Sequence, residues 1–417
     1  MIYVFYFFAA VLVFLGWQSW RGGILYLEFF RKELAAPPSN YTPFCSIIVP
    51  CRGLDEDLHE NLVALFRQDF PRYEIVFVVD DERDEAVSII RHLMSEPLAA
   101  ANDLTRRKST YSLPRTVLTK LVIAGKAISE SQKVHNLRQA VLEVSETSEA
   151  FVLVDSDARP NENWLRNLIA PLQNETVGCA TGYRWFISKN TSFASELRSV
   201  WNASVASALG ANTKKNFCWG GSTAIRRDVF ERLNVREQWR GTASDDFAVT
   251  RMMKNADLPI RFVPQALTAT VENCSFRQLL EFSTRQMKIT RVYAEHLWKA
   301  ALIGSLVFSV VFWMGVALLF FLSGFHFALT LFLVTLIFAL GAGKAFWRLK
   351  AVKLILKDYE PELNRQFLSH LTLWTITPPL YFYNSVCALF SRKIVWRGIE
   401  YELKSATKTV ISTTNQS

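Results

Sequence analysis

The sequence predicts a membrane-anchored α/β protein with a mostly parallel sheet and hydrophobic helices toward both ends of the chain. Apolar runs alternate with helical patterns between residues 45 and 154, a β-α-β rhythm typical of a doubly wound sheet. Uncharged segments of spanning length occur near the start of the 417-residue chain and after residue 300. The region between them, 40–298, has a soluble composition and is long enough to bury a substantial core.

The first expected element is a membrane anchor at 2–20, which carries no charge. No basic segment precedes it and no small-residue cleavage site is evident, so we expect an uncleaved anchor rather than a signal peptide. Two further spans are expected at 300–322 and 325–346. A fourth apolar stretch, 368–390, is interrupted by two adjacent prolines. It is expected to be either a kinked span or a re-entrant hairpin that keeps the basic tail inside.

The distribution of basic residues predicts the orientation. Such residues follow the first span and fill the loop 347–367. By the positive-inside rule, we expect a multi-pass integral membrane protein with its α/β region in the cytoplasm. These basic residues beside the spans, together with a surface that faces anionic lipid, account for the net charge of +9. No basic, aromatic-interleaved module suggests a nucleic-acid partner, and the six cysteines, which form no C-x-x-C pair, are expected to be reduced core thiols.

The elements of the α/β region alternate along the chain. Strands are expected at 45–49, 74–79, 120–123 and 151–154, with helices at 58–68, 84–94 and 132–144. After residue 157 the pattern loosens to a tight small-residue loop at 219–223 and a helix running from 245 to about 254, which Ser244 is placed to cap. An exposed loop is expected at 106–112 and a disordered, low-complexity tail at 405–417.

These elements divide the chain into seven expected segments. The segment before the first spanning pair is amphipathic, so we expect it to lie in the membrane interface. The segments are an anchor at 1–22, an α/β domain at 40–274, an interfacial helix at 275–298, two transmembrane helices at 300–346, a basic cytoplasmic loop at 347–367, the proline-interrupted segment at 368–390, and a basic, then polar tail at 391–417.

The most informative motif is Asp155-Ser156-Asp157, which follows the fourth expected strand. Residues two apart on an extended segment point to the same face, so the two carboxylates lie side by side and repel. A hard divalent cation relieves this repulsion, and Mg²⁺ or Mn²⁺ held in this way takes further ligands from substrate phosphates. The carboxyl end of a strand in an open α/β sheet is also where nucleotides bind. The motif therefore indicates a metal-bound diphosphate.

The other strand ends carry polar groups in matching places. Pro50 and Arg52 follow the first strand, an acidic turn at 80–84 follows the second, and Lys133 begins the helix after the third. Acids and lysines along one sheet edge form an electrostatic site for a nucleotide with a metal-bound diphosphate.

Together these motifs resemble the family 2-like (GT-A) glycosyltransferases, most closely the ceramide glucosyltransferases and their bacterial lipid glycosyltransferase relatives. The resemblance covers about 40–298 and extends to the membrane layout. It rests on Ile48-Val49-Pro50-Cys51-Arg52-Gly53, Asn61-Leu62, the segment 68–74, the acidic turn at 80–84, Lys133 with Asn136-Leu137, Asp155-x-Asp157, Gly220-x-Ser222 with Arg226-Arg227, and Asp245-Asp246-Phe247.

The resemblance implies a GT-A fold and a role for each motif. The acidic turn would contact uridine through Asp81, with Asp84 as the alternative. Asp155 and Asp157 would hold Mg²⁺ or Mn²⁺ on the diphosphate, and Asp246 would deprotonate the acceptor hydroxyl. The remaining implied residues are Pro50, Arg52 and Lys133 on the donor side and Trp219, Gly220, Gly221, Ser222 and Asp245 on the acceptor side.

One implied residue needs a compensating environment. Asp246 lies in the first turn of its expected helix, where the helix dipole favours the ionised carboxylate and lowers its basicity. Burial or the neighbouring Asp245 would have to offset this effect.

One motif departs from the family. Its usual Gln/Arg-x-x-Arg-Trp pattern would fall at 285–289, where the sequence reads Arg-Gln-Met-Lys-Ile. Arg285 occupies the first position, and either Lys288 or Arg291, one turn further on, is expected to contact the diphosphate. Ile289 cannot replace the tryptophan, which argues against a growing glycan as acceptor.

We therefore expect inverting transfer of a hexose, most simply from UDP-glucose, to the hydroxyl of a membrane lipid such as ceramide or diacylglycerol at the cytoplasmic leaflet. Two alternatives stay open, a processive polysaccharide synthase and a catalytically silent membrane scaffold with the same fold. No sequence feature predicts an oligomeric state.

Overall fold

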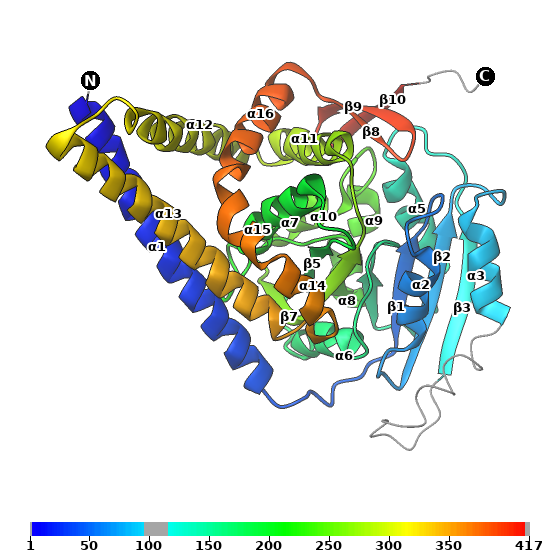
Figure 1. The fold of residues 1–417 in the computed structure, drawn as a ribbon. Coiled ribbons are helices and arrows are strands. Elements are labelled where there is room, and N and C mark those ends of the chain that lie inside the picture. The colour runs from blue at the N-terminus through cyan, green and yellow to red at the C-terminus, as the bar shows by residue number, and fades with distance from the viewer. Residues whose placement is uncertain (1, 96–115, 413–417) are drawn as a thin grey trace. The chain divides into compact units, whose positions relative to one another are not determined.

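The computed structural model describes residues 2–95 and 116–412, so the loop expected at 106–112 lies outside the described residues. The chain forms two compact units, most of whose elements are labelled in Figure 1. We name them the helical unit, residues 1–32, 186–207 and 272–392, and the sheet unit, residues 33–185, 208–271 and 393–417.

The sheet unit contains a seven-stranded sheet with the order β3-β2-β1-β4-β6-β5-β7. Strands β3, β2, β1 and β4 are parallel neighbours, whereas β6 runs antiparallel to β4 and β5. The predicted α/β class with a mostly parallel sheet is confirmed. The strands are β1 (Cys45–Pro50), β2 (Arg72–Val79), β3 (Thr116–Ile123), β4 (Ala150–Leu153), β5 (Cys179–Ile187), β6 (Thr223–Arg226) and β7 (Ile260–Val271).

Helices follow β1, β2 and β3 in the predicted places. The third of them ends at residue 140, four residues earlier than expected, and the side chain of Ser131 caps its start by accepting a hydrogen bond from Val134 N–H at 3.3 Å. The helices of this unit are α2 (Leu58–Phe66), α3 (Ala86–Ser95), α5 (Gln132–Ala140), α6 (Trp164–Ile169), η1 (Ala170–Gln173), α8 (Arg227–Arg232), α9 (Val235–Gln238) and α10 (Asp245–Asn255).

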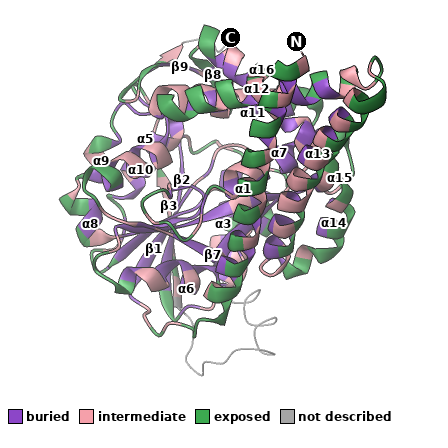
Figure 2. Ribbon diagram, turned by 90° about the vertical axis from the view of Figure 1, so that its left-hand side faces the viewer, coloured by how far each residue is buried: buried purple, intermediate pink, exposed green. Residues whose placement is uncertain are grey.

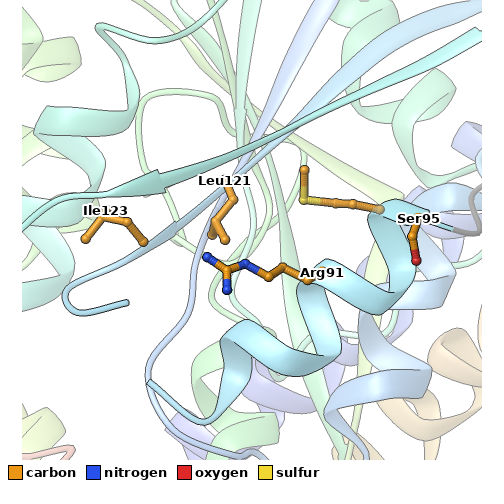
Figure 3. A pocket seen from close by; sticks show the side chains of 5 residues that line it. Arg91, Ser95, Leu121 and Ile123 are labelled. Carbon is orange, nitrogen blue, oxygen red and sulfur yellow. The ribbon is translucent and has the colours of Figure 1, made fainter. Parts of the chain in front are cut away.

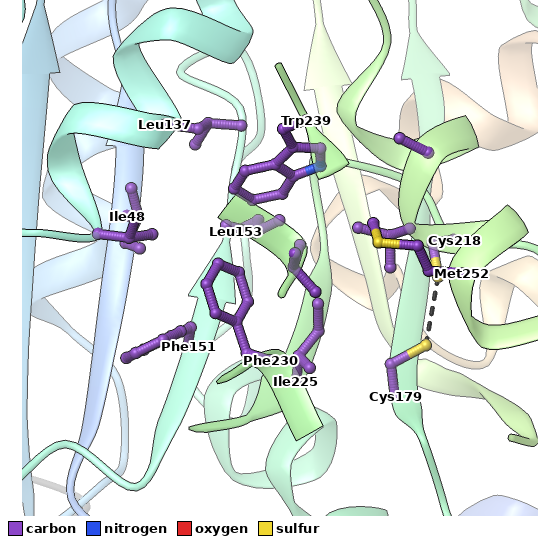
Figure 4. Packing of buried hydrophobic residues seen from close by; sticks show 14 of the residues in the cluster. Ile48, Leu137, Phe151, Leu153, Cys179, Cys218, Ile225, Phe230, Trp239 and Met252 are labelled. Carbon is purple, nitrogen blue, oxygen red and sulfur yellow. Dashed lines mark hydrogen bonds between the residues drawn. The ribbon is translucent and has the colours of Figure 1, made fainter. Parts of the chain in front are cut away.

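The core of the sheet unit joins the central strands to α5, α8 and α10. Figure 4 shows Leu137, Phe230 and Trp239 gathered beside Ile48 and Phe151. The strands are nearly continuous apolar runs because both of their faces are covered. Five of the six cysteines are buried thiols, in agreement with the expectation of reduced core residues.

A second sheet of three antiparallel strands lies at the end of the sheet unit, coloured red in Figure 1. Its strands are β8 (Lys393–Trp396), β9 (Ile399–Ser405) and β10 (Lys408–Ser412). The expectation of a disordered tail from residue 405 is therefore wrong as far as residue 412. Tyr401 and Leu403 are buried while their neighbours along β9 are more exposed, a two-residue alternation. The polar composition of the segment hides this short pattern.

The helical unit contains the candidate membrane spans. Three described helices are long and apolar enough to cross a membrane: α1 (Ile2–Ala35), α12 (Glu295–Leu318) and α13 (Gly324–Lys353). They match the three predicted spans. Large apolar side chains such as Phe7, Ile303 and Phe332 are exposed on them, as lipid-facing residues are. Figure 2 contrasts the exposed residues of α1 (green) with the buried strands (purple).

Two boundaries in the helical unit differ from the prediction. The helix expected at 275–298 ends at residue 293, because Ala294 leaves the helical conformation with φ −145° and ψ 63°, and Trp298 belongs to α12. The segment 368–390 is divided among three helices, none of which is a candidate span in the described chain, and its prolines lie in the first turn of the last of them. The remaining helices are α7 (Phe193–Ala206), α11 (Phe276–Tyr293), η2 (Lys357–Tyr359), α14 (Glu360–Arg365), α15 (Phe367–Thr372), η3 (Leu373–Thr375) and α16 (Thr377–Phe390).

Candidate functional site

The carboxyl ends of β1 to β4 share one edge of the sheet because these strands are parallel neighbours. Arg52, Asp80, Lys126 and Asp155 each follow one of these strands within three residues, and Pro50 is the last residue of β1. Lys126 Nζ lies 3.0 Å from Asp80 Oδ2, and Arg52 also forms an ion pair with Asp80. The structure thus brings charged residues from distant parts of the sequence to one edge.

A hollow of about 470 Å³ opens at this edge. Its lining includes three residues that were expected on the donor side, Arg52, Asp81 and Asp84. Asp84 accepts hydrogen bonds from Gly53 N–H at 2.9 and 3.0 Å, so it holds the loop after β1. Asp81 is half-buried, and hydrogen bonds from Arg83 lower its pKa to about 2. This arrangement favours Asp81 over Asp84 as a ligand contact.

A second hollow of about 500 Å³ lies against α3 and β3 (Figure 3). It is lined by Arg91, Met94, Ser95, Leu121 and Ile123, none of which is an expected site residue. Arg91 is the single charged group in this lining, so the hollow lacks the paired acids and bases of the first one.

The two acids of Asp155-Ser156-Asp157 lie side by side and share one cation. Arg184, on β5, places its guanidinium 3.3 Å from Asp155 Oδ2 and 2.9 Å from Asp157 Oδ2. Burial would raise the pKa of Asp155, but Lys133 and Arg184 hold that pKa below its ordinary value. Asp155 therefore stays ionised, as a cation site requires. Sequence reasoning missed Arg184, because β5 lies beyond the region of regular alternation.

Lys133 links this pair to the acids of α10. Its Nζ lies 2.6 Å from Asp155 Oδ1 and 3.0 Å from Asp245 Oδ1. Burial would lower the pKa of Lys133, but Asp155, Asp245 and Asp246 raise it, so the ammonium stays charged. Burial raises the pKa of Asp245 to about 6, against the lowering effect of Lys133. The expected donor-side lysine thus lies between the D-x-D pair and the acids of the expected acceptor side.

Asp245 and Asp246 have different surroundings although they are adjacent. Asp245 is 2% exposed, whereas Asp246 is half-buried. Asp246 Oδ1 accepts hydrogen bonds from Phe247 N–H at 2.7 Å and from Ser244 Oγ. Ser244 therefore bonds Asp246 and does not cap α10 with its side chain, contrary to expectation. Asp245 is thus the buried member of the pair, and Asp246 is the more accessible carboxylate.

The loop at 219–223 packs directly on these groups. A Cβ atom added at Gly220 would lie 2.2 Å from Asp245 Oδ2 and 2.8 Å from Lys133 Nζ, so glycine is required by close approach and not by a positive φ. The Trp219 ring centroid lies 4.7 Å from the guanidinium carbon of Arg184.

Two further residues of the loop, Gly221 and Ser222, have packing roles. A Cβ atom at Gly221 would lie 2.2 Å from the ring of Trp219. Ser222 is fully buried, where its Oγ accepts a hydrogen bond from Trp164 Nε1 at 2.8 Å and donates one to Ala266 O at 3.2 Å. Ser222 is therefore bound within the core.

The basic residues expected to replace the family's Arg-Trp motif lie on α11 in the helical unit. The Arg285 guanidinium lies 5.7 Å from the ring centroid of Phe282. Lys288 Nζ lies 3.5 Å from Ser391 Oγ, and Arg291 donates to the carbonyl of Leu389 at 2.8 Å. Their contact with a diphosphate stays a prediction.

The donor set at the sheet edge suits a hard divalent cation. Asp155 and Asp157 are neighbours that both pair with the guanidinium of Arg184. In the described part of the chain, no group of three or more His, Cys, Asp or Glu side chains could hold a metal by itself. One or two carboxylates are nevertheless what Mg²⁺ uses when substrate phosphates supply further oxygens. The residues present therefore fit the predicted metal.

Comparisons with known proteins agree with the predicted class. A model of the family described as "Glycosyl transferase family 21" matches residues 4–409. "Ceramide glucosyltransferase 1" of Caenorhabditis elegans is 28% identical over 71 residues, 17% of this chain and 15% of that protein. "Ceramide glucosyltransferase 3" of the same organism is 25% identical over 132 residues, 31% and 25% of the two chains.

Another curated relative, the ceramide glucosyltransferase of Gibberella zeae, is 24% identical over 191 residues, 42% of this chain and 34% of that protein. In each match the chain spans no more than about a third of the relative's length. The solved mannosyltransferase PcManGT from Pyrobaculum calidifontis, in complex with GDP-Man and Mn²⁺, has a TM-score of 0.45 and 18% identity, covering 92% of this chain and 99% of that chain. Three described helices are long and apolar enough to cross a membrane. Because the family model covers nearly the whole chain, the chain belongs to glycosyl transferase family 21.

Proposed function

We propose that this glycosyltransferase moves a hexose, which we expect to be glucose, from a UDP-sugar to the hydroxyl of a ceramide- or diacylglycerol-type membrane lipid, with inversion at the anomeric carbon. One observation carries the proposal: Lys133 joins Asp155 to Asp245 at the sheet edge, with Asp246 adjacent. This cluster supports the proposal because it joins the acids that we assign to the diphosphate with those that we assign to the acceptor. The lipid acceptor is supported by the candidate spans and by the printed names of the ceramide glucosyltransferase relatives.

The reaction assigns a task to each group. The lipid hydroxyl oxygen bonds to the anomeric carbon while the bond from that carbon to the diphosphate oxygen breaks, and UDP leaves with the bonding electrons. Asp246 takes the hydroxyl proton, because it is the more accessible of the two adjacent acids. Asp155 and Asp157 would hold a Mg²⁺ or Mn²⁺ ion, whose charge stabilises the departing diphosphate. Lys133 keeps positive charge between donor and acceptor and orients Asp245.

The orientation belongs to the same proposal. Basic residues after the first span and in the loop 347–367 favour a cytoplasmic sheet unit, which gives it access to cytoplasmic UDP-sugars. We also propose that the segment 368–390 re-enters the membrane. Protease added to sealed vesicles of known orientation tests this proposal, because it cleaves only the parts of the protein that face it. Cleavage of the sheet unit only when the extracytoplasmic face is exposed to the protease would contradict the orientation.

The experiment is a transfer assay with purified full-length protein, UDP-glucose, Mn²⁺ and ceramide or diacylglycerol, with lipid products measured by mass spectrometry. We expect one added hexose, and a fall in turnover of at least about 100-fold for Asp246→Asn. The matched control is Asp257→Asn, whose side chain is 89% exposed after the end of α10. No lipid product with several UDP-sugars, or normal turnover by Asp246→Asn, would refute the proposal. Products that carry many added sugars would instead indicate a polysaccharide synthase. A protein that does not bind UDP would indicate a catalytically silent scaffold.

A further inference from the structure

The tip of the β8–β9 hairpin has an unusual backbone. Trp396 pairs with Ile399, so Arg397 and Gly398 alone form the turn, and their φ angles are +50° and +77°. Two-residue turns of this kind need positive φ at both positions, and Asn, Asp or Gly is the usual first residue. A residue with a long side chain is strained at a positive φ, and backbone strain of this kind is concentrated at functional sites.

The Arg397 side chain points to the charged edge of the large sheet. Its guanidinium forms an ion pair with Asp55, its carbonyl accepts a hydrogen bond from Arg52 Nε at 3.1 Å, and it lines the 470 Å³ hollow. Burial lowers the pKa of Arg397, but Asp55, Asp157 and Asp155 raise it overall. The guanidinium therefore lies within the electrostatic field of both D-x-D acids.

The preceding residue contacts the same cluster. Lys133 Nζ lies 6.0 Å from the ring centroid of Trp396, near the limit of a cation–π contact. Lys133 also holds Asp155 at 2.6 Å, so the hairpin tip and the D-x-D motif share a neighbour.

The hairpin is fastened to the sheet unit away from its tip. Tyr401 is 1% exposed, and its hydroxyl accepts a hydrogen bond at 3.1 Å from the N–H of Gln132, the first residue of α5. Gly241 allows a second close approach, because a Cβ atom there would lie 2.4 Å from the carbonyl oxygen of Thr407. The tip is therefore held in place in the lining of the hollow, and the basic tail contributes Arg397 to that lining.

We propose that Arg397 is a donor-binding residue that contacts the diphosphate of the nucleotide sugar, an inference that rests on the proposed function. The chain has lysine and isoleucine where the family pattern has its Arg-Trp pair, so a guanidinium contact for phosphate is missing from α11 at that position. Arg397 supplies a guanidinium beside the metal-binding acids, and its planar fork suits two phosphate oxygens at once. The turn fixes the backbone of Arg397 before the donor binds, and Asp55 pairs with its guanidinium while no donor is present.

The test is calorimetric binding of UDP and of uridine to full-length protein with Mn²⁺. Arg397→Ala is expected to weaken UDP binding about 10- to 100-fold, as loss of a charge-assisted hydrogen bond does, and to leave uridine binding unchanged because uridine has no phosphate. The UDP affinity of Arg397→Lys should lie between that of the wild type and that of Arg397→Ala. Lys404→Ala, which removes an exposed cation paired with Glu402 in the same sheet, is expected to bind both probes as the wild type does.

A second variant separates binding from structure. Asp55→Asn breaks the same ion pair but keeps the guanidinium, so we expect its UDP affinity to stay within about threefold of the wild type. Equal loss in Asp55→Asn and Arg397→Ala, equal loss for UDP and uridine, or wild-type UDP affinity in Arg397→Ala each overturns the role of Arg397. Lack of UDP binding by the wild type overturns the proposed function itself.

Discussion

The substitution Gly220→Ala tests the contact between the 219–223 loop and the charged cluster. The added Cβ atom would lie 2.2 Å from Asp245 Oδ2 and 2.8 Å from Lys133 Nζ, whereas ordinary contacts begin at 3.4 Å. Asp245 must therefore move by about 1 Å, and Lys133 by about half as much. Because Lys133 also holds Asp155 at 2.6 Å, the displacement reaches the D-x-D motif.

The expected effect is larger on turnover than on stability. A misplacement of about 1 Å in a catalytic cluster costs on the order of 100-fold in rate. Overpacking costs about 1–3 kcal/mol, and the lower end is expected here because both displaced atoms are the ends of side chains. Turnover is measured as UDP release with lipid acceptor, and the free energy of unfolding by denaturant titration in detergent.

The matched control is Gly210→Ala, because a Cβ atom at Gly210 meets nothing within 4 Å and its φ is not positive. We expect wild-type turnover from this control. Equal turnover by Gly220→Ala and Gly210→Ala would refute the close approach of the loop to Asp245. A loss of turnover fully explained by unfolding of Gly220→Ala would refute the local character of the effect.

Two further predictions concern stability and metal. Burial would raise the pKa of Glu130, but hydrogen bonds from His135 and a backbone N–H, with pairing to Arg138, lower it from 4.5 to about 2. This depressed pKa stabilises the fold above pH 4.5 by up to about 3 kcal/mol, which is lost as the pH falls toward 2. Glu130→Gln should cost about 3–5 kcal/mol at neutral pH and show a flatter acid profile in unfolding titrations; an unchanged profile contradicts the assignment. Removal of divalent cations with EDTA should abolish turnover and Mn²⁺ should restore it, so full turnover in EDTA would exclude a metal at the D-x-D motif.

Local patterns in the sequence predicted the first half of the sheet unit well. Strands β1, β2 and β4 are short apolar runs bounded by polar residues, so the places where they end, and with them Arg52, Asp80 and Asp155, follow from local pattern. Parallel neighbours then place those residues at one edge. The three candidate spans follow from length and composition in the same way.

The sequence pattern gave wrong predictions of secondary structure where the chain is polar or irregular. The segment that forms β10 was expected to be disordered, because it is a short strand in a polar segment. The helix at 275–298 was expected to be continuous, because nothing in its amphipathic pattern marks the break at Ala294.

The sequence by itself therefore determined the fold class, the three candidate spans and the order of acids along the sheet edge, since each depends on neighbouring residues. Only the tertiary structure decided which cations meet those acids. Arg184 reaches the D-x-D pair from β5, and Arg397 meets Asp55 across 342 residues of sequence. Such pairs depend on strand order and hairpin packing, which have no local periodicity, and a charged residue in an irregular segment looks like any solvated one until its partner is placed.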